Sequence, residues 1–122
     1  EIGRAASPVT FMRRTVTQDT VLDGTPLAAG AKVTLWYGSA NRDESKFADP
    51  WTFDVRRHPN PHVGFGGGGA HFCLGANLAR REITVAFEEL HRQLPDIVAV
   101  EEPDRLQSAF IHGIKRLPVA WG

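Results

Sequence analysis

Cysteine is scarce in this chain of 122 residues, which contains only Cys73. A single cysteine excludes an internal disulfide framework and fits a reducing compartment, so we expect a cytoplasmic protein. It also disfavours a zinc site, because no paired histidine spacing supplies the remaining ligands. The chain has no apolar run long enough to cross a bilayer and no secretory signal, so this segment should carry no membrane anchor.

A net charge is missing as well, since 14 Lys and Arg balance 14 Asp and Glu. This balance gives no sign of a nucleic-acid partner. Hydrophobic residues make up 42% of the chain, which is enough for the core of one modest domain. The chain does not begin with methionine, and Glu1-Ile2-Gly3-Arg4 has the composition of a helix without a cap before it. We therefore expect a segment of a longer protein.

The first third of the chain predicts a short helix followed by strands. Residues 1–6 should end a helix that Ser7-Pro8 closes, because the residue before a proline avoids the helical region. The extended segments that follow are rich in Val and Thr and are bounded by turn residues. They are residues 9–21, bent near Thr15, the turns Asp23-Gly24 and Ala29-Gly30, and residues 32–36. Together they should form a small antiparallel sheet.

One long helix dominates the rest of the expected structure. Residues 40–47 should hold a helical turn or two, and prolines then impose a long coil that reaches Gly69. Residues 74–94 have apolar side chains at helical spacing, and Pro95 ends the helix. The remaining elements are a strand over 96–100, an acidic loop over 101–104 and two short strands within 106–121 that turn near Gly113. The chain is thus expected to be α+β.

Cys73 lies between a glycine-rich loop and this long helix. The sequence there runs Phe65-Gly66-Gly67-Gly68-Gly69-Ala70-His71-Phe72-Cys73-Leu74-Gly75. The thiolate is the form that binds iron, and the positive end of a helix favours it. Glycines let a backbone approach a flat macrocycle, and Phe65 and Phe72 are placed to shield the sulfur from water. We expect Cys73 to be the axial ligand of a haem iron, which implies oxygen chemistry.

Two other interpretations of the loop stay open. Cys73 could be an ordinary buried small hydrophobic residue. The glycines could instead form a phosphate cradle at a helix N-terminus. The phosphate interpretation is disfavoured, because no Lys-Ser or Lys-Thr follows the loop and no clear strand precedes it.

From its first residue to its last, the chain resembles the cytochrome P450 family of haem-thiolate monooxygenases. The signature of that family places an aromatic residue, glycines and a basic residue before Cys-x-Gly and an alanine. It is matched by Phe65, Gly69, His71, Cys73, Gly75 and Ala79. Other family motifs follow in family order: Glu1-Ile2-Gly3-Arg4, Ser7-Pro8-Val9 with Arg14, Ala40-Asn41-Arg42-Asp43, the segment 47–53 and Leu117-Pro118-Val119. Residues 60–65 and 110–115 are most similar to bacterial methyl-branched lipid omega-hydroxylases and sterol-oxidising relatives.

The resemblance implies that residues 1–122 are the C-terminal haem-binding part of a single, mostly α cytochrome P450 domain that is incomplete at its N-terminus. The parent protein would hydroxylate a hydrophobic substrate, such as a methyl-branched lipid or a sterol, with haem b (iron protoporphyrin IX) and O₂. Electrons would come from a ferredoxin-type redox partner and its reductase. The fragment alone should be inactive. A non-catalytic haem carrier or sensor that uses the same Cys73 is the alternative, and a structural remnant without haem is a third possibility.

The resemblance also assigns roles to individual residues. The residues expected around the haem are Cys73 as ligand, Arg14 and His71 at the propionates, and Phe65, Gly66, Gly69, Gly75 and Ala79. The residues expected to line the substrate pocket are Val9, Thr10, Phe11, Phe110 and Ile111. Glu1 and Arg4 should form a buried structural network, and the basic helix face of Arg80, Arg81 and Arg92 should dock an acidic electron-transfer partner.

Two departures from the family pattern affect these expectations. Phe65 lies eight residues before Cys73, where the family usually has seven, so the loop is one residue longer. Thr52 stands where the family often has an arginine that completes a network with the glutamate and arginine of the first motif. Arg56 and Arg57 are the candidates to replace it, and a network closed in a different way is the alternative.

Overall fold

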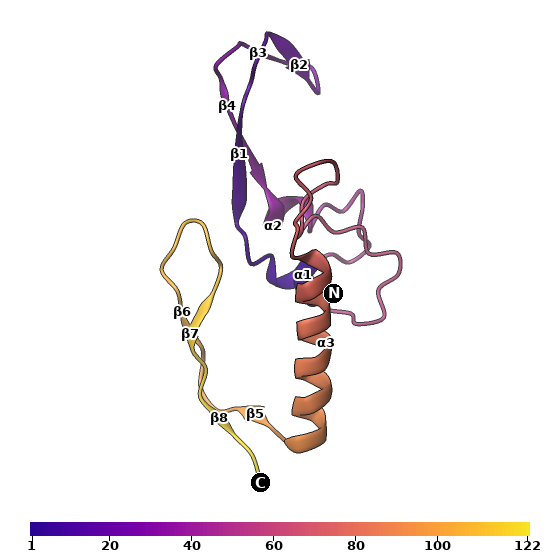
Figure 1. Ribbon diagram of the computed structural model, residues 1–122, viewed down its shortest axis with the longest axis vertical. Helices are drawn as coiled ribbons and strands as arrows, with labels where there is room; N and C mark the ends of the chain where they lie inside the picture. Colours follow the sequence, from indigo (N-terminus) through magenta and orange to yellow (C-terminus); the bar gives the residue numbers. More distant parts are fainter. The chain divides into compact units, whose positions relative to one another are not determined.

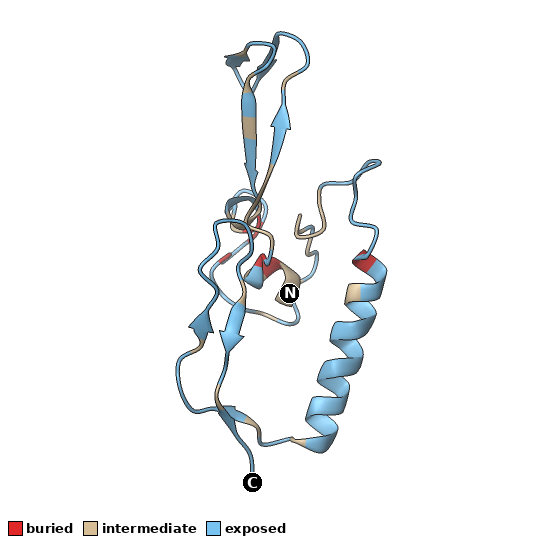
Figure 2. Cartoon of the chain, turned by 60° about the vertical axis from the view of Figure 1, so that its left-hand side comes forward, coloured by how far each residue is buried: buried red, intermediate tan, exposed pale blue.

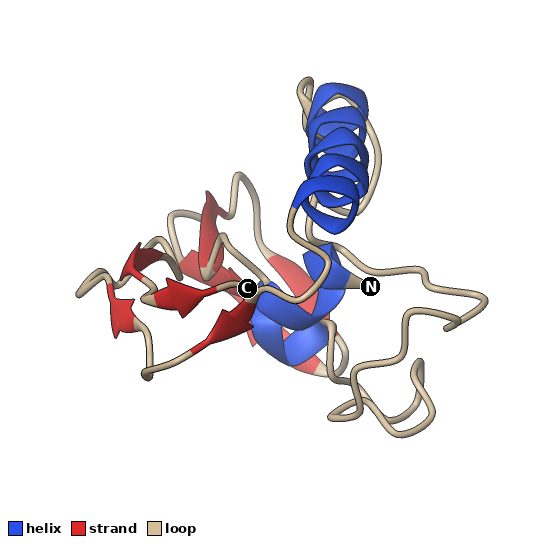
Figure 3. Cartoon of the chain, turned by 90° about the horizontal axis from the view of Figure 1, so that it is seen from below, coloured by secondary structure: helices blue, strands red, loops and turns tan.

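The computed structural model describes all 122 residues, in which one long helix, two short helices and short strands are separated by irregular segments (Figure 1; Figure 3). The chain forms two units that are described one at a time below. The first unit contains residues 1–64 and 109–111, and the second contains residues 65–108 and 112–122. No helix is both long enough and apolar enough to span a membrane.

The first unit begins with helix α1 (Ile2–Ala6), which ends where the sequence predicts. Ser7 adopts a left-handed conformation with φ 40°, and its N–H bonds the Gly3 carbonyl. Strands β1 (Phe11–Thr15) and β4 (Lys32–Trp36) then pair antiparallel, with Arg14 opposite Val33. The bounds of β4 are those predicted for the strand over residues 32–36, so this prediction is confirmed.

A separate hairpin joins β2 (Thr20–Leu22) to β3 (Thr25–Leu27). Its turn residues Asp23 and Gly24 both have positive φ, 46° and 76°, which matches the twist of the two strands. The predicted turn is confirmed. The expectation of one antiparallel sheet is wrong, because the ladder β1–β4 and the ladder β2–β3 share no strand.

Helix α2 (Tyr37–Ala40) follows β4 directly, so the helical turn expected within residues 40–47 lies earlier than predicted. Asn41 N–H closes the helix by bonding the Tyr37 carbonyl at 2.9 Å. Asp43 then accepts hydrogen bonds from the N–H groups of Ser45 and Phe47, which hold the chain in turns instead of helix. No helix or strand forms from there to residue 75, as the prolines predict.

The core of the first unit is small and mostly polar. Figure 2 shows how few parts of the chain are buried. The buried residues are Arg4, Ser7, Asn41, Phe47 and Pro50, and the Arg4 guanidinium lies 5.4 Å from the centre of the Phe47 ring. Buried polar side chains need partners, so their hydrogen bonds decide how this unit is held together.

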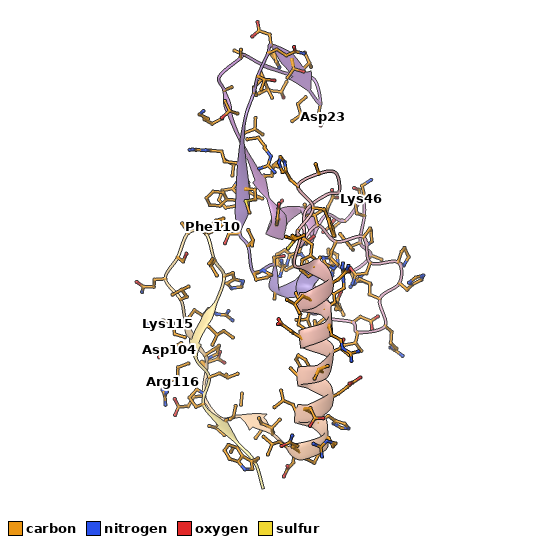
Figure 4. All side chains as sticks on the ribbon, in the orientation of Figure 1. Asp23, Lys46, Asp104, Phe110, Lys115 and Arg116 are labelled. Atoms are coloured by element: carbon orange, nitrogen blue, oxygen red, sulfur yellow. The ribbon has the colours of Figure 1, made fainter.

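Helix α3 (Ala76–Gln93) is the main element of the second unit and confirms the helix predicted over residues 74–94. Four very short strands follow it: β5 (Val98–Ala99), β6 (Asp104–Arg105), β7 (Ile114–Arg116) and β8 (Val119–Ala120). Strand β5 pairs with β8, and β6 pairs with β7, where Asp104 lies opposite Arg116 (Figure 4).

Of three expectations for this C-terminal region, one is confirmed only in part and two are wrong. The strand predicted over residues 96–100 is shortened to β5, and the predicted acidic loop over 101–104 contains the first residue of β6. Both β7 and β8 come after Gly113, so they do not turn back on each other there. Each strand depends on a remote partner, and the Gly113 carbonyl instead accepts the Leu106 N–H at 2.9 Å to close a loop.

Candidate functional site

Glu1 and Arg4 form a buried ion pair at the start of the first unit. The Arg4 guanidinium donates to both Glu1 carboxylate oxygens, at 2.6 and 2.8 Å, and the exposed fractions of the two side chains are 1% for Arg4 and 3% for Glu1. Arg4 also donates to the carbonyls of Asn41, Pro50 and Thr52. The pair therefore ties helix α1 to the long coil, unlike an exposed pair one helical turn apart.

Arg57 completes this network where Thr52 lacks a basic side chain. Its guanidinium lies 3.4 Å from the Glu1 carboxylate and donates to the carbonyls of Ala48, Asp49 and Thr52 at 2.6 to 3.1 Å. Thr52 thus contributes a carbonyl that accepts from Arg4 and Arg57. Hydrogen bonds from Arg4, the Asp54 N–H and Arg57 lower the pKa of Glu1 from 4.5 to about 2, against the opposing effect of burial.

Asn41 is a second buried connection, which the sequence did not single out. Its side-chain amide donates to the Ser7 hydroxyl at 2.9 Å, and its oxygen accepts the Val63 N–H at 2.8 Å. Asn41 is fully buried, and both ends of its amide are satisfied. It therefore fixes the coil residue that lies two positions before Phe65 in the chain. The only sequence signal was its place in Ala40-Asn41-Arg42-Asp43.

The predicted substrate-pocket residues come together from two distant parts of the chain. Val9 forms an isolated antiparallel β-bridge with Ile111, and the Thr10 N–H donates to the Phe110 carbonyl at 2.9 Å. The rings of Phe11 and Phe110 meet edge to face with centroids 6.2 Å apart, beside strand β1 (Figure 4). Trp36, which the sequence did not suggest, adds a third ring 5.0 Å from Phe11. The result is an aromatic cluster with half-exposed edges.

Arg14 lies on strand β1 with its side chain exposed. Its guanidinium bonds only the carbonyl of Arg13, at 3.0 Å. The neighbouring Arg13 is also exposed, and it lies on the opposite face of the strand because side chains alternate. Arg14 therefore presents a cation that is not neutralised by a carboxylate.

The Cys73 loop opens the second unit. The Cys73 N–H donates to the Phe65 carbonyl at 3.0 Å, and the Phe72 N–H donates to the Gly69 carbonyl at 3.1 Å. Gly66, Gly68 and Gly69 have φ of 93°, 95° and 78°, a conformation that L side chains rarely adopt. Glycine is required at these positions by the backbone itself.

The residues of this loop fit a haem-thiolate site. Within this chain the Cys73 thiol is exposed, which leaves it accessible to a metal ion. A Cβ added at Gly67, Gly68 or Gly69 would meet no atom within 4 Å, which leaves that side of the loop open to a flat ring. The Ala76 N–H at the start of α3 donates to the Cys73 carbonyl and not to its sulfur. His71 and Gly75 are exposed nearby in the loop, and Ala79 is half-buried on α3.

Phe65 has a partner that the sequence did not predict. The Arg80 guanidinium, on the second turn of α3, lies 4.6 Å from the centre of the Phe65 ring. The ring is thereby attached to the helix that follows the loop. The signal for this contact is weak, because a stacked arginine and a solvated one look alike in a sequence.

The family model described as Cytochrome P450 matches residues 1–94. The chain belongs to the cytochrome P450 family. Among solved P450 structures, that of Mycobacterium marinum in complex with pseudoionone is 48% identical with a TM-score of 0.95, and the match covers 98% of this chain and 29% of that one. The P450 from Bacillus megaterium in complex with testosterone is 41% identical with a TM-score of 0.90, over 97% of this chain and 33% of that one. The predicted family and its α+β fold are confirmed.

Two curated relatives match almost the whole of this chain. The methyl-branched lipid omega-hydroxylase of Mycobacterium tuberculosis is 77% identical over 121 residues, 99% of this chain and 28% of the relative. The steroid C26-monooxygenase of Rhodococcus jostii is 51% identical over 119 residues, 98% of this chain and 25% of the relative. The chain therefore spans about a quarter of the length of these proteins. Both are named as enzymes, so the carrier or sensor alternative gains no support.

Proposed function

We propose that this chain belongs to a P450 monooxygenase that hydroxylates a hydrophobic substrate, and that Cys73 is the axial ligand of its haem b iron. The observation that carries the proposal is the exposed Cys73 thiol at the end of an open glycine loop, directly before α3. A lone cysteine of this kind also fits a cytoplasmic enzyme.

Several residues of the chain would bind different parts of the haem. Cys73 would supply the thiolate, the glycines 66–69 would lie against the ring, and Arg14 and His71 would pair with the propionates. Bound haem supplies the activation of O₂, with the thiolate favouring O–O cleavage. The network of Glu1, Arg4 and Arg57 holds the coil that leads to the loop.

Electrons would arrive from a ferredoxin-type partner and its reductase at the exposed basic side of α3. Arg80 and Arg81 carry charges there that no carboxylate neutralises, whereas Arg92 pairs with Glu89 on the same helix at 2.5 Å. We therefore place the attraction for an acidic partner on the first two arginines. Such attraction acts on the association rate and weakens as salt rises.

A methyl-branched lipid is the substrate class that we propose, on the strength of the 77% identity. A steroid is the second candidate, since a steroid monooxygenase is 51% identical. The apolar cluster of Phe11, Phe110 and Trp36 suits the hydrocarbon part of either molecule. Turnover of branched lipids, unbranched lipids and sterols by the intact protein decides between them, and inactivity on both lipids would reject the first candidate.

The ligand assignment is tested by Cys73→Ser in the intact protein loaded with haem. The ferrous carbon monoxide complex of the wild type should show the red-shifted Soret band of thiolate ligation, and the serine variant should lose it. Cys73→His is the control, because an imidazole keeps an iron ligand but changes its type. A serine variant with an unchanged band would show that Cys73 is not the ligand.

A further inference from the structure

The Phe65 ring is held by a cation. The Arg80 Cζ lies 4.6 Å from the ring centroid, inside the distance of about 6 Å at which a guanidinium is attracted to an aromatic face. Phe65 opens the glycine loop, and Arg80 stands on the helix that follows it. The contact therefore links the first residue of the loop to α3, the helix that follows the loop.

The backbone of Phe65 is held as well. Its carbonyl accepts the Cys73 N–H at 3.0 Å, so the two ends of the loop meet at this hydrogen bond. Between them, Gly67, Gly68 and Gly69 have no Cβ and sit in open space. Glycines without packing leave a backbone free to move, so contacts at the ends of the loop, including those of Phe65, help to fix its position.

The next residue offers a comparison within the same helix. Arg81 carries the same charge and is exposed, but no ring or carboxylate contacts it. Any effect of charge alone should be nearly equal for the two arginines, since they are adjacent. An effect that belongs to Arg80 alone must come from its contact with the ring.

We propose that Arg80 is a positioning residue that fixes the Phe65 ring and so limits the access of water to the Cys73 thiolate. The proposal rests on the proposed function of Cys73 as haem ligand. It explains how a loop one residue longer than the family pattern can still place its aromatic residue: the ring is anchored from the helix side. A freed ring would admit water, whose hydrogen bonds to the sulfur would weaken its hold as a ligand.

The test compares Arg80→Met with Arg81→Met in the intact haem-loaded protein. The quantity measured is the rate at which the thiolate-type Soret band of the ferrous carbon monoxide complex decays. Arg80→Met should raise this rate about 2- to 5-fold, the population change that corresponds to an exposed cation–π contact. Arg81→Met should decay at the wild-type rate. Equal rates for the two variants would overturn the proposal.

Two further measurements keep the result decisive. In a Phe65→Leu background the Arg80 substitution should add nothing, because its target ring is gone; an undiminished effect there would also overturn the proposal. If Arg80→Met does not fold, the pair Arg80→Gln and Arg81→Gln, which also removes the cation, is compared in the same way. A wild type without any thiolate-type band would instead refute the proposed ligand, which separates the two failures.

Discussion

At the scale of single residues, Arg56 and Arg57 are neighbours with opposite surroundings. The Arg57 side chain is 11% exposed, pairs with Glu1 and donates hydrogen bonds to three backbone carbonyls. The Arg56 side chain is 91% exposed and pairs only with Asp54, at 3.6 Å. Removing one partner of a buried polar network leaves the other groups unsatisfied. The same change at the surface leaves them to water.

We therefore predict that Arg57→Ala lowers the free energy of unfolding of the intact protein by about 2–3 kcal/mol. The matched variant Arg56→Ala should change it by less than about 0.5 kcal/mol. Urea unfolding of both variants measures the difference. Similar losses in the two would mean that Arg57 does not close the network in solution.

The Glu1 carboxyl gives this network a pH dependence. Its folded pKa is about 2, below the ordinary value of 4.5, so the ionised form is favoured by folding. The resulting stability is fully present above pH 4.5 and is lost as the pH falls through about 2. The loss should amount to about 3 kcal/mol, at 1.36 kcal/mol per pKa unit.

Glu1→Gln removes the titrating group and serves as the comparison. Over this acid range, the free energy of unfolding of the wild type should fall more steeply than that of the variant. Acid titration of stability, followed by circular dichroism in denaturant, measures both slopes. Parallel curves would show that the Glu1 carboxylate is not paired in the native state.

At the scale of elements, two glycines near the Cys73 loop differ in the space around them. A Cβ at Gly64 would lie 2.9 Å from the Gly3 carbonyl oxygen and 3.0 Å from His62 Nδ1, so coil and α1 would have to separate. A Cβ at Gly67 would meet nothing within 4 Å. Neither glycine has the positive φ that would itself strain an alanine.

Gly64→Ala should therefore destabilise the intact protein by about 1–3 kcal/mol, the usual cost of overpacking. In the haem-free protein Gly67→Ala should be tolerated, with a change below about 1 kcal/mol in either direction, because no atom of the chain would meet the added methyl group. Thermal unfolding and haem retention of the two variants check this. If the second variant were the more damaging even without haem, the open side of the loop would have to be occupied by protein.

The elements also show how far the sequence could predict the structure. Helix α3, strand β4 and the turn at Asp23-Gly24 followed from local signals: helical spacing, Val- and Thr-rich composition and a two-residue turn pair. The C-terminal strands did not, because strands of two or three residues exist only through partners such as Val98 and Ala120. Periodicity does not reach across that distance.

The candidate site, too, was only partly predictable from the sequence. The glycine loop and Cys73 were visible because their residue types are unusual and adjacent. The contacts of Asn41 and Arg80 were not, since their partners include an N–H group and a ring that many residues could meet. For Arg57 the sequence left a choice with Arg56, because the carbonyls that it bonds carry no sequence signal. Such partners leave no mark on the sequence, and only the fold brings them together.

At the scale of the whole molecule, apolar surface exceeds what the chain can bury. Phe47 and Ala76 are the only buried hydrophobic residues, whereas large apolar side chains on α3 remain exposed. Ile83, Phe87 and Leu90 recur at helical spacing with exposed fractions of 37%, 56% and 41%. A stripe of this kind normally packs against another element. The chain spans 28% of its 77%-identical relative, so the rest of such a protein is available to cover the stripe.

We predict that Phe87→Ala lowers the free energy of unfolding of the intact protein by about 3 kcal/mol, because it removes a ring from a packed interface. In the isolated 122-residue chain the same change should have almost no effect, since the ring is already half exposed. Glu88→Ala, one position along the helix, is the control and should be mild in both. A Phe87→Ala cost equal in the two proteins would mean that the stripe stays uncovered, and that this chain folds by means of its own small core.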